Sequence, residues 1–213
     1  MESVHYNRTC LPVLHRCDVA VIGGSFAGVS AALALARAGR SVVVVEPRTY
    51  LGREVTATLR PWVRAPAGGG LAALPEVVAA CLEASAARAE GDEYPLHLDA
   101  CKIRLEDLLL EAGARLVYAS LPVAVLATAG AVEGVVIGNK SGRQVILCRI
   151  VIDATETALV ARLAGAQFAP WPSGLATFRR TLEFDNILPL PWGFKGGQVA
   201  EFPNSAPIRW SGP

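Results

Sequence analysis

CDVAVIGGSFAGVSAALALARAGRSVVVVE, residues 17–46, is the stretch that decides the fold. Residues 18–22 are a short run rich in β-branched side chains, residues 23–28 are a glycine turn, and residues 29–38 are rich in alanine and leucine. This order predicts a strand, a tight turn and a helix. Residues 41–45 are apolar without alternation, which is typical of a strand in a parallel sheet that is covered on both faces.

The turn has the composition of a phosphate-binding loop, in which backbone N–H groups and a helix N-terminus approach a pyrophosphate. Gly23 opens the turn, Ser25 stands where the second glycine of G-x-G-x-x-G usually sits, and Gly28 lets the helix pack closely on the strand. The Ser25 hydroxyl could itself reach a phosphate oxygen. Glu46, 18 positions after Gly28, ends the second strand and is expected to accept ribose hydroxyls. The candidate turn contacts are Gly23, Gly24, Ser25, Phe26, Ala27 and Gly28.

The segment after Glu46, residues 47–66, lacks clear periodicity and is predicted to be a loop. Loops that leave the carboxyl ends of parallel strands face the ligand crevice. A solvated surface loop is the alternative interpretation. The candidate cofactor contacts here are Pro47, Arg48, Gly52, Arg53, Thr56 and Thr58.

Two helices and a strand are predicted next. The first helix spans residues 71–90, with Pro75 in its first turn and its apolar side chains against the sheet. The second helix has Asp99 as its candidate N-cap. Residues 115–119 have the composition of a strand. The buried stripe of the second helix is predicted to be Leu105, Leu108 and Leu109.

The period changes to two after Pro122, with strands near residues 123–128, 132–138 and 143–152. Short turns separate them, so the segment is predicted to be a β-meander. Its last strand is a buried run that ends in small and polar residues, as strands next to ligands commonly do. Ala154 and Thr155 are therefore candidate contacts.

Composition limits the class of protein. The 213 residues include 20 basic and 19 acidic side chains, so the net charge of +1 does not favour nucleic acid or an anionic membrane. Residues 19–36 carry no charge, but the glycines at their start fit a nucleotide-binding turn better than a membrane span. The five cysteines are scattered without C-x-x-C spacing, which predicts free thiols and no metal site. No signal-peptide core is visible, so a cytoplasmic location is expected.

The sequence divides into three parts. Residues 1–16 are interpreted as an N-terminal extension and residues 17–165 as a nucleotide-binding domain. Residues 166–213 are rich in proline and lack long periodicity. They are expected to be the start of an incomplete second domain for substrate, or a tail that contacts a partner.

Residues 18–168 resemble the N-terminal, FAD-binding part of FAD-dependent oxidoreductases of the glutathione-reductase structural group. The resemblance rests on VIGGSFAG with Glu46, on EPRTYLGREVTA after it, and on VIDAT at residues 151–155. It implies an α/β, Rossmann-like FAD/NAD(P)-binding fold of three layers, namely a parallel sheet, helices and the β-meander. It also implies FAD as the cofactor and an adenine contact at Val123.

This chain departs from the family pattern at two glycines, which are replaced by Arg53 and Glu156. An arginine near a pyrophosphate is electrostatically favourable. A glutamate is less so, and Glu156 either turns to solvent or pairs with Arg53.

The leading hypothesis is an oxidoreductase whose bound flavin accepts a hydride from a small organic substrate. The catalytic residues stay unassigned. An alternative is a non-catalytic or truncated flavin-binding subunit, in which a partner chain or a second copy completes the FAD site. A weaker alternative is NAD binding at the same turn. Of the two nicotinamide cofactors NAD is the better fit, because the carboxylate of Glu46 would repel the 2′-phosphate of NADP.

Overall fold

The computed structural model describes residues 10–58, 61–65, 70–86 and 93–170, and the backbone of 174–176 and 208–210. The chain divides into two compact units, Met1–Ala166 and Gln167–Pro213, which are described separately. The predictions for residues 1–9 and for most of residues 171–213 lie outside the described part of the chain.

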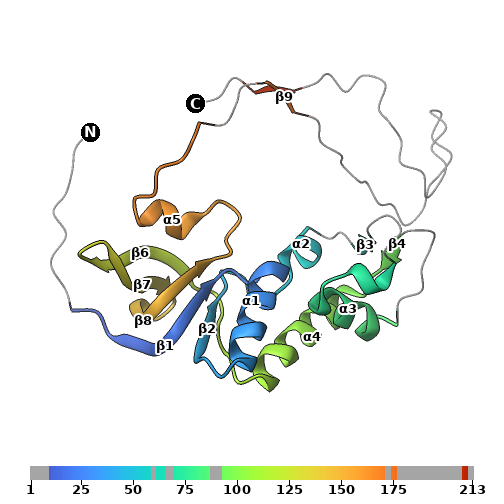
Figure 1. Ribbon diagram of the computed structural model, residues 1–213, viewed down its shortest axis with the longest axis horizontal. Helices are drawn as coiled ribbons and strands as arrows, with labels where there is room; N and C mark the ends of the chain where they lie inside the picture. The colour runs from blue at the N-terminus through green and yellow to red at the C-terminus, as the bar shows by residue number, and fades with distance from the viewer. Residues whose placement is uncertain are drawn as a thin grey trace. The chain divides into compact units, whose positions relative to one another are not determined.

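A mixed sheet forms the centre of the first unit (Figure 1), with its strands in the order β5-β2-β1-β8-β7-β6. β5, β2, β1 and β8 are parallel, and β6 and β7 extend the sheet as antiparallel neighbours. The strands are β1 (Val13–Ile22), β2 (Val42–Val45), β5 (Arg115–Val117), β6 (Leu121–Thr128), β7 (Ala131–Asn139) and β8 (Gly142–Asp153). The predicted βαβ unit and β-meander are confirmed, and the last meander strand pairs directly with β1.

Helices and short elements complete the first unit. α1 follows the glycine turn, and β3 pairs with β4 in a small antiparallel sheet. The bounds are α1 (Phe26–Arg37), α2 (Arg53–Thr56), β3 (Trp62–Arg64), a 3₁₀ turn (Leu71–Ala73), α3 (Glu76–Ala84), β4 (Glu93–Pro95), α4 (Leu98–Glu111) and α5 (Leu159–Leu163). Figure 1 shows α1, α3 and α4 together on one side of the sheet, with α5 on the side of β6.

The two faces of the sheet build separate cores, because successive side chains of a strand point to opposite faces. Val19 and Val21 of β1 pack with the buried faces of α1, α3 and α4. Ala20 and Ile22 pack on the other face with Val135 of β7 and with other side chains of β7, β8 and α5. The meander therefore covers the face that the helices leave open, which gives the three layers that the resemblance implies.

The structure corrects several details of the sequence interpretation. The helix predicted over residues 71–90 spans Glu76–Ala84 in the described residues, with Pro75 as its N-cap. It packs against α1 and α4, and its buried face joins the same core as the sheet residues Val19 and Val21. The N-cap of α4 is His97, whose Nδ1 accepts from the Ala100 N–H at 3.2 Å, so the prediction of Asp99 is wrong. The loop predicted over residues 47–66 contains α2 and β3.

The end of β8 also differs from the prediction of a buried run. Ile150 is exposed, and Val151, Ile152 and Asp153 are partly buried. The predicted stripe of α4 is confirmed, with Leu105, Leu108 and Leu109 all buried.

The cysteines, the lengths of the helices and the second unit each add one observation. All five cysteines are free thiols, as predicted. Among the described residues, every helix is too short or too polar to cross a membrane. In the second unit, β9 (Gly174–Ala176) pairs with β10 (Ile208–Trp210) in an antiparallel ladder.

Candidate functional site

The carboxyl ends of three parallel strands meet at one edge of the sheet. Ile22 of β1 is paired with Val45 of β2 on one side and with Asp153 of β8 on the other. Backbone hydrogen bonds join the segments that leave these strands, from the Gly23 N–H to the Val45 carbonyl and from the Ala154 N–H to the Ile22 carbonyl, both at 2.8 Å. Segments far apart in sequence are therefore fixed side by side at this edge.

The backbone of the glycine turn lies in close contact with the backbone at the end of β8. Gly23 has a φ of 106°, a left-handed conformation, and a Cβ there would overlap the carbonyl oxygen of Ala154. Gly28 lies in the first turn of α1, where a Cβ would overlap the carbonyl oxygen of Gly23. Side chains at these positions would separate α1, the turn and β8, so the cradle requires both glycines.

Ser25 is the N-cap of α1. Its Oγ accepts from the Gly28 N–H at 3.0 Å and donates to the Ala154 carbonyl at 3.4 Å, and the residue is buried. The hydroxyl thus satisfies a backbone donor of the helix end. The hydroxyl is engaged inside the turn, and its contact with a phosphate oxygen stays a prediction.

Glu46 links the turn to the segment after β2, and its side chain is 1% exposed. Its Oε2 accepts from the Gly24 N–H at 2.6 Å, and its Oε1 accepts from the Arg48 N–H at 3.0 Å. The guanidinium of Arg48 lies 3.6 Å from the same Oε1. A carboxylate has about four acceptor positions, so each oxygen keeps capacity for another donor, such as a ribose hydroxyl.

Arg53 and Arg48 both lie close to Glu156. Arg53 Nε lies 3.0 Å and Arg48 Nη2 lies 3.6 Å from Glu156 Oε1. Arg53 Nη1 also donates to the Ala154 carbonyl at 3.0 Å. Of the two alternatives for Glu156, the structure has the pairing with Arg53, while the carboxylate itself remains 60% exposed.

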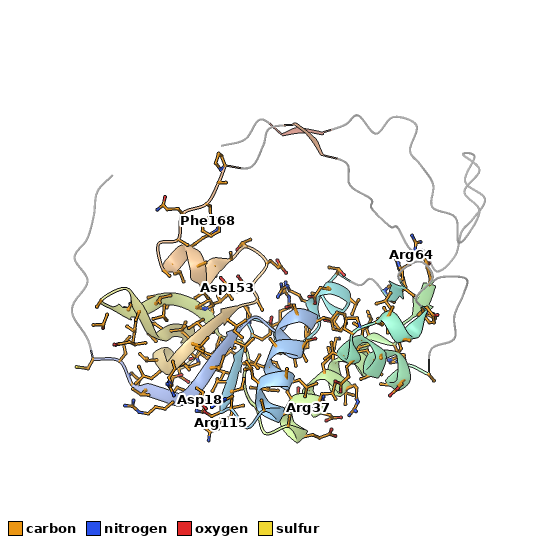
Figure 2. All side chains as sticks on the ribbon, in the orientation of Figure 1. Asp18, Arg37, Arg64, Arg115, Asp153 and Phe168 are labelled. Carbon is orange, nitrogen blue, oxygen red and sulfur yellow. The ribbon has the colours of Figure 1, made fainter. Side chains whose placement is uncertain are left out.

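Asp153 holds the segment between β8 and α5. Its Oδ1 accepts from the Thr155 N–H and Oγ1, at 3.0 and 2.6 Å, and its Oδ2 accepts from the Ala161 N–H at 2.9 Å. Burial raises the pKa of Asp153, but these hydrogen bonds outweigh it and lower the pKa below the ordinary value. Figure 2 shows Asp153 at the α5 end of β8, with Asp18 and Arg115 toward the opposite edge of the sheet.

A cavity of about 150 Å³ lies at this edge, and we call it the site cavity. Of the residues predicted from sequence, it brings together Gly23, Glu46, Pro47, Arg48, Arg53 and Thr155. Its other lining residues are Pro122, Glu156, Thr157 and Leu159.

The remaining predicted residues do not line the site cavity. Gly24, Ser25, Phe26, Ala27 and Gly28 form the turn and the start of α1. Gly52 is the N-cap of α2, and the buried Thr56 donates to the Leu51 and Gly52 carbonyls at 2.9 Å. Thr58 is exposed, Val123 is exposed on β6, and the Ala154 carbonyl accepts from Ser25 and Arg53.

Sequence reasoning missed Glu54, Pro122, Thr157 and Leu159. Both carboxylate oxygens of Glu54 accept from the Phe26 N–H, at 3.1 and 3.2 Å. Pro122 adjoins the predicted Val123, and Thr157 and Leu159 follow the predicted Thr155. Pro122, Thr157 and Leu159 lie close in sequence to predicted contacts, and this proximity was the signal that could have identified them. No sequence pattern connects Glu54 to Phe26.

Comparison with known protein families shows the family to which the chain belongs. Residues 18–171 match the family model described as FAD dependent oxidoreductase. The chain belongs to the FAD-dependent oxidoreductase family. FAD is accordingly its cofactor. No curated protein matches the chain by sequence.

Solved structures show the same fold. THI4 from Thermovibrio ammonificans aligns with a TM-score of 0.55 and 24% identity over 71% of this chain and 64% of that protein. A geranylgeranyl bacteriochlorophyll reductase-like protein from Thermoplasma acidophilum gives a TM-score of 0.53 and 21% identity over 72% and 43% of the two chains. L-proline dehydrogenase from P. horikoshii gives 0.52 and 17% over 76% and 59%. The chain thus spans about two thirds or less of the length of each.

The residues of this FAD-dependent oxidoreductase family member fit the ADP half of the cofactor. Gly23 lines the site cavity without a side chain, the N-terminus of α1 presents backbone N–H groups, and Glu46 keeps acceptor capacity beside the site cavity. Arg48 and Arg53 add positive charge that suits a pyrophosphate. The donor set is thus chemically complementary to a diphosphate joined to a ribose.

Proposed function

We propose that this chain is the FAD-binding part of an oxidoreductase that removes a hydride from a small organic substrate. FAD supplies the hydride-accepting ring system when it is bound. The observation that carries the proposal is the convergence of the glycine turn, Glu46, Arg48 and Arg53 on one cavity at the carboxyl ends of parallel strands. Ligands of α/β folds bind at such an edge.

The proposed division of labour follows from the chemistry of each group. Glu46 accepts the ribose hydroxyls, and the backbone N–H groups at the start of α1 meet the pyrophosphate. Arg48 and Arg53 neutralise its charge. The part of the site nearest to β6, with Pro122 and its neighbour Val123, is proposed to contact the adenine.

A second candidate is a flavin-binding part that does no chemistry until another polypeptide segment completes the site. It is supported by the size of the site cavity, because 150 Å³ is small beside the roughly 300–1,000 Å³ of ordinary ligand pockets. The additional walls would come from a partner chain or a second copy of this one. A small-molecule substrate and a cytoplasmic location belong to the same proposal.

The visible spectrum of the purified protein tests the proposal. We expect flavin absorbance bands that dithionite bleaches, and FAD in the mass spectrum of the small molecule released on denaturation. NAD in that spectrum would support the weaker alternative, and a protein that stays colourless with added FAD would refute flavin binding. If FAD is bound but every artificial electron acceptor fails to support turnover until a second polypeptide is added, the second candidate holds.

Glu46→Gln tests the role of the carboxylate. Hydrogen bonds to charged groups contribute about 1.5–3 kcal/mol, so the loss of one should weaken FAD binding roughly tenfold or more. Glu83→Gln is the matched control, because Glu83 is an exposed carboxylate on α3, away from the lining of the site cavity. Equal FAD affinity in the two variants, with unchanged melting temperatures, would exclude Glu46 as the ribose acceptor.

A further inference from the structure

We propose that Glu54 and Glu156 are internal anions that occupy the phosphate-binding groups of the site, so that FAD must displace both carboxylates in order to bind. This inference rests on the proposed function and concerns how that same site is regulated. It comes from two independent contacts, one at the start of α1 and one across the site cavity.

The first contact places a carboxylate on the N-terminus of α1. Glu54 comes from the first turn of α2, and both of its oxygens lie within hydrogen-bond distance of the Phe26 N–H, at 3.1 and 3.2 Å. Free N–H groups and the helix dipole make such a terminus an anion site. Ser25 already satisfies the Gly28 N–H at this helix end. Glu54 therefore takes a backbone donor that a phosphate oxygen needs.

The second contact places a carboxylate between the two arginines. Glu156 Oε1 lies 3.0 Å from Arg53 Nε and 3.6 Å from Arg48 Nη2. Both guanidiniums and Glu156 line the site cavity. Arg48 also lies 3.6 Å from Glu46, so acidic and basic groups alternate across the cavity in the order Glu46, Arg48, Glu156, Arg53.

The charge balance of the site follows from these contacts. The site contains two guanidiniums, which lie near Glu46 and Glu156, and a third carboxylate, that of Glu54, at the start of α1, so these five groups together carry a net negative charge. A pyrophosphate adds negative charge and is repelled unless carboxylates move away. Glu54 and Glu156 are both exposed and can swing into water, whereas Glu46 is buried and hydrogen-bonded to backbone. The two exposed carboxylates are therefore the displaceable ones.

Equilibrium titration of the full-length protein with FAD tests the inference, using Glu54→Gln, Glu156→Gln and the double variant. Exposed ion pairs contribute about 0.2–1 kcal/mol and a charge at a helix terminus about 0.3–1 kcal/mol, which converts to an expected tightening of about 1.4- to fivefold for each single variant. The double variant should bind about tenfold more tightly. Glu83→Gln, an exposed carboxylate on α3, should leave the affinity unchanged.

Two ligands separate the phosphate effect from a general change in the protein. ADP carries the pyrophosphate and ribose, so its affinity should rise by the same factor as that of FAD. Adenosine carries no anion, so its affinity should be the same in every variant. Glu156→Gln should also have a smaller effect in an Arg53→Gln background, because Arg48 is then the remaining guanidinium that the substitution frees.

The outcomes distinguish this inference from the proposed function. If the wild type binds FAD and the variants bind it no more tightly, or if adenosine gains as much as ADP, the inference is overturned while FAD binding stands. If the wild type and all variants fail to bind FAD, the proposed function fails and the inference fails with it. A wild type that binds FAD weakly or not at all, with variants that bind it well, supports both.

Discussion

Gly28→Ala is a substitution for which local propensity and tertiary packing predict opposite signs. Gly28 lies within α1 and has an ordinary helical φ, so helix propensity alone predicts a gain in stability of about 1 kcal/mol. In the folded chain, however, the new Cβ would overlap the Gly23 carbonyl oxygen and lie 3.1 Å from the Ala154 Cβ. The obstacle is backbone and cannot rotate away.

The magnitude follows from these two terms. Overpacking costs about 1–3 kcal/mol, and a backbone obstacle belongs at the upper end of that range. Subtracting the propensity gain leaves a loss of about 2 kcal/mol in the free energy of unfolding. For a chain of this length, such a loss lowers the melting temperature by roughly 4–8 °C.

Urea denaturation followed by far-UV circular dichroism measures the effect, and Ala34→Gly is the matched control. Ala34 is exposed in the same helix, so its replacement reports the propensity term alone and should cost about 1 kcal/mol. If Gly28→Ala instead stabilises the protein by as much as Ala34→Gly destabilises it, the close approach of α1, the turn and β8 is refuted.

Two further predictions concern the ends of β1 and β8. Ser25→Ala should lower the free energy of unfolding by about 1 kcal/mol because the N-cap is lost, whereas Ser25→Gly should cost a few tenths; equal losses in thermal denaturation would contradict the capping role. The lowered pKa of Asp153 means that its carboxylate stabilises the fold above the unfolded pKa near 3.9. That contribution is lost as the pH falls below this value. Asp153→Asn should therefore lower the melting temperature at pH 7 and flatten its decline between about pH 5 and pH 3. Parallel pH profiles for the two proteins would contradict the assignment.

Much of the fold was predictable because its signals are local. The buried valines of β2 and the alternating strands from β6 to β8 have periods that a short window contains. The N-cap of α4 was harder to predict from sequence, because the side chains of both His97 and Asp99 can accept a hydrogen bond from a backbone N–H at a helix N-terminus. The His97 N–H donates to Ser85 Oγ at 2.9 Å, a contact with the end of α3 that fixes how the chain enters the helix.

The candidate site was predictable to the extent that it follows strand ends. Glu46 comes directly after β2 and Thr155 is the second residue after β8, and both line the site cavity with Gly23 of the predicted turn. The pairing of Arg53 with Glu156 joins residues about a hundred positions apart, so sequence left two alternatives open. The contact between Glu54 and Phe26 depends on how α2 is placed over the start of α1, which no periodicity encodes.

The pairing of β1 with β8 has a consequence for the order in which the protein forms. Residues 17–46 are continuous in the chain, yet Ser25 and its partner Ala154 are separated by 129 positions. Pairing of strands far apart in sequence requires the intervening loop to close, and this loses conformational entropy before the contacts between the strands form. Such pairing is therefore a slow step in folding. During synthesis, β1 has an unpaired edge until β8 has emerged. Residues 17–46 are thus made well before β8, and the cradle around the glycine turn is complete when the two strands have paired.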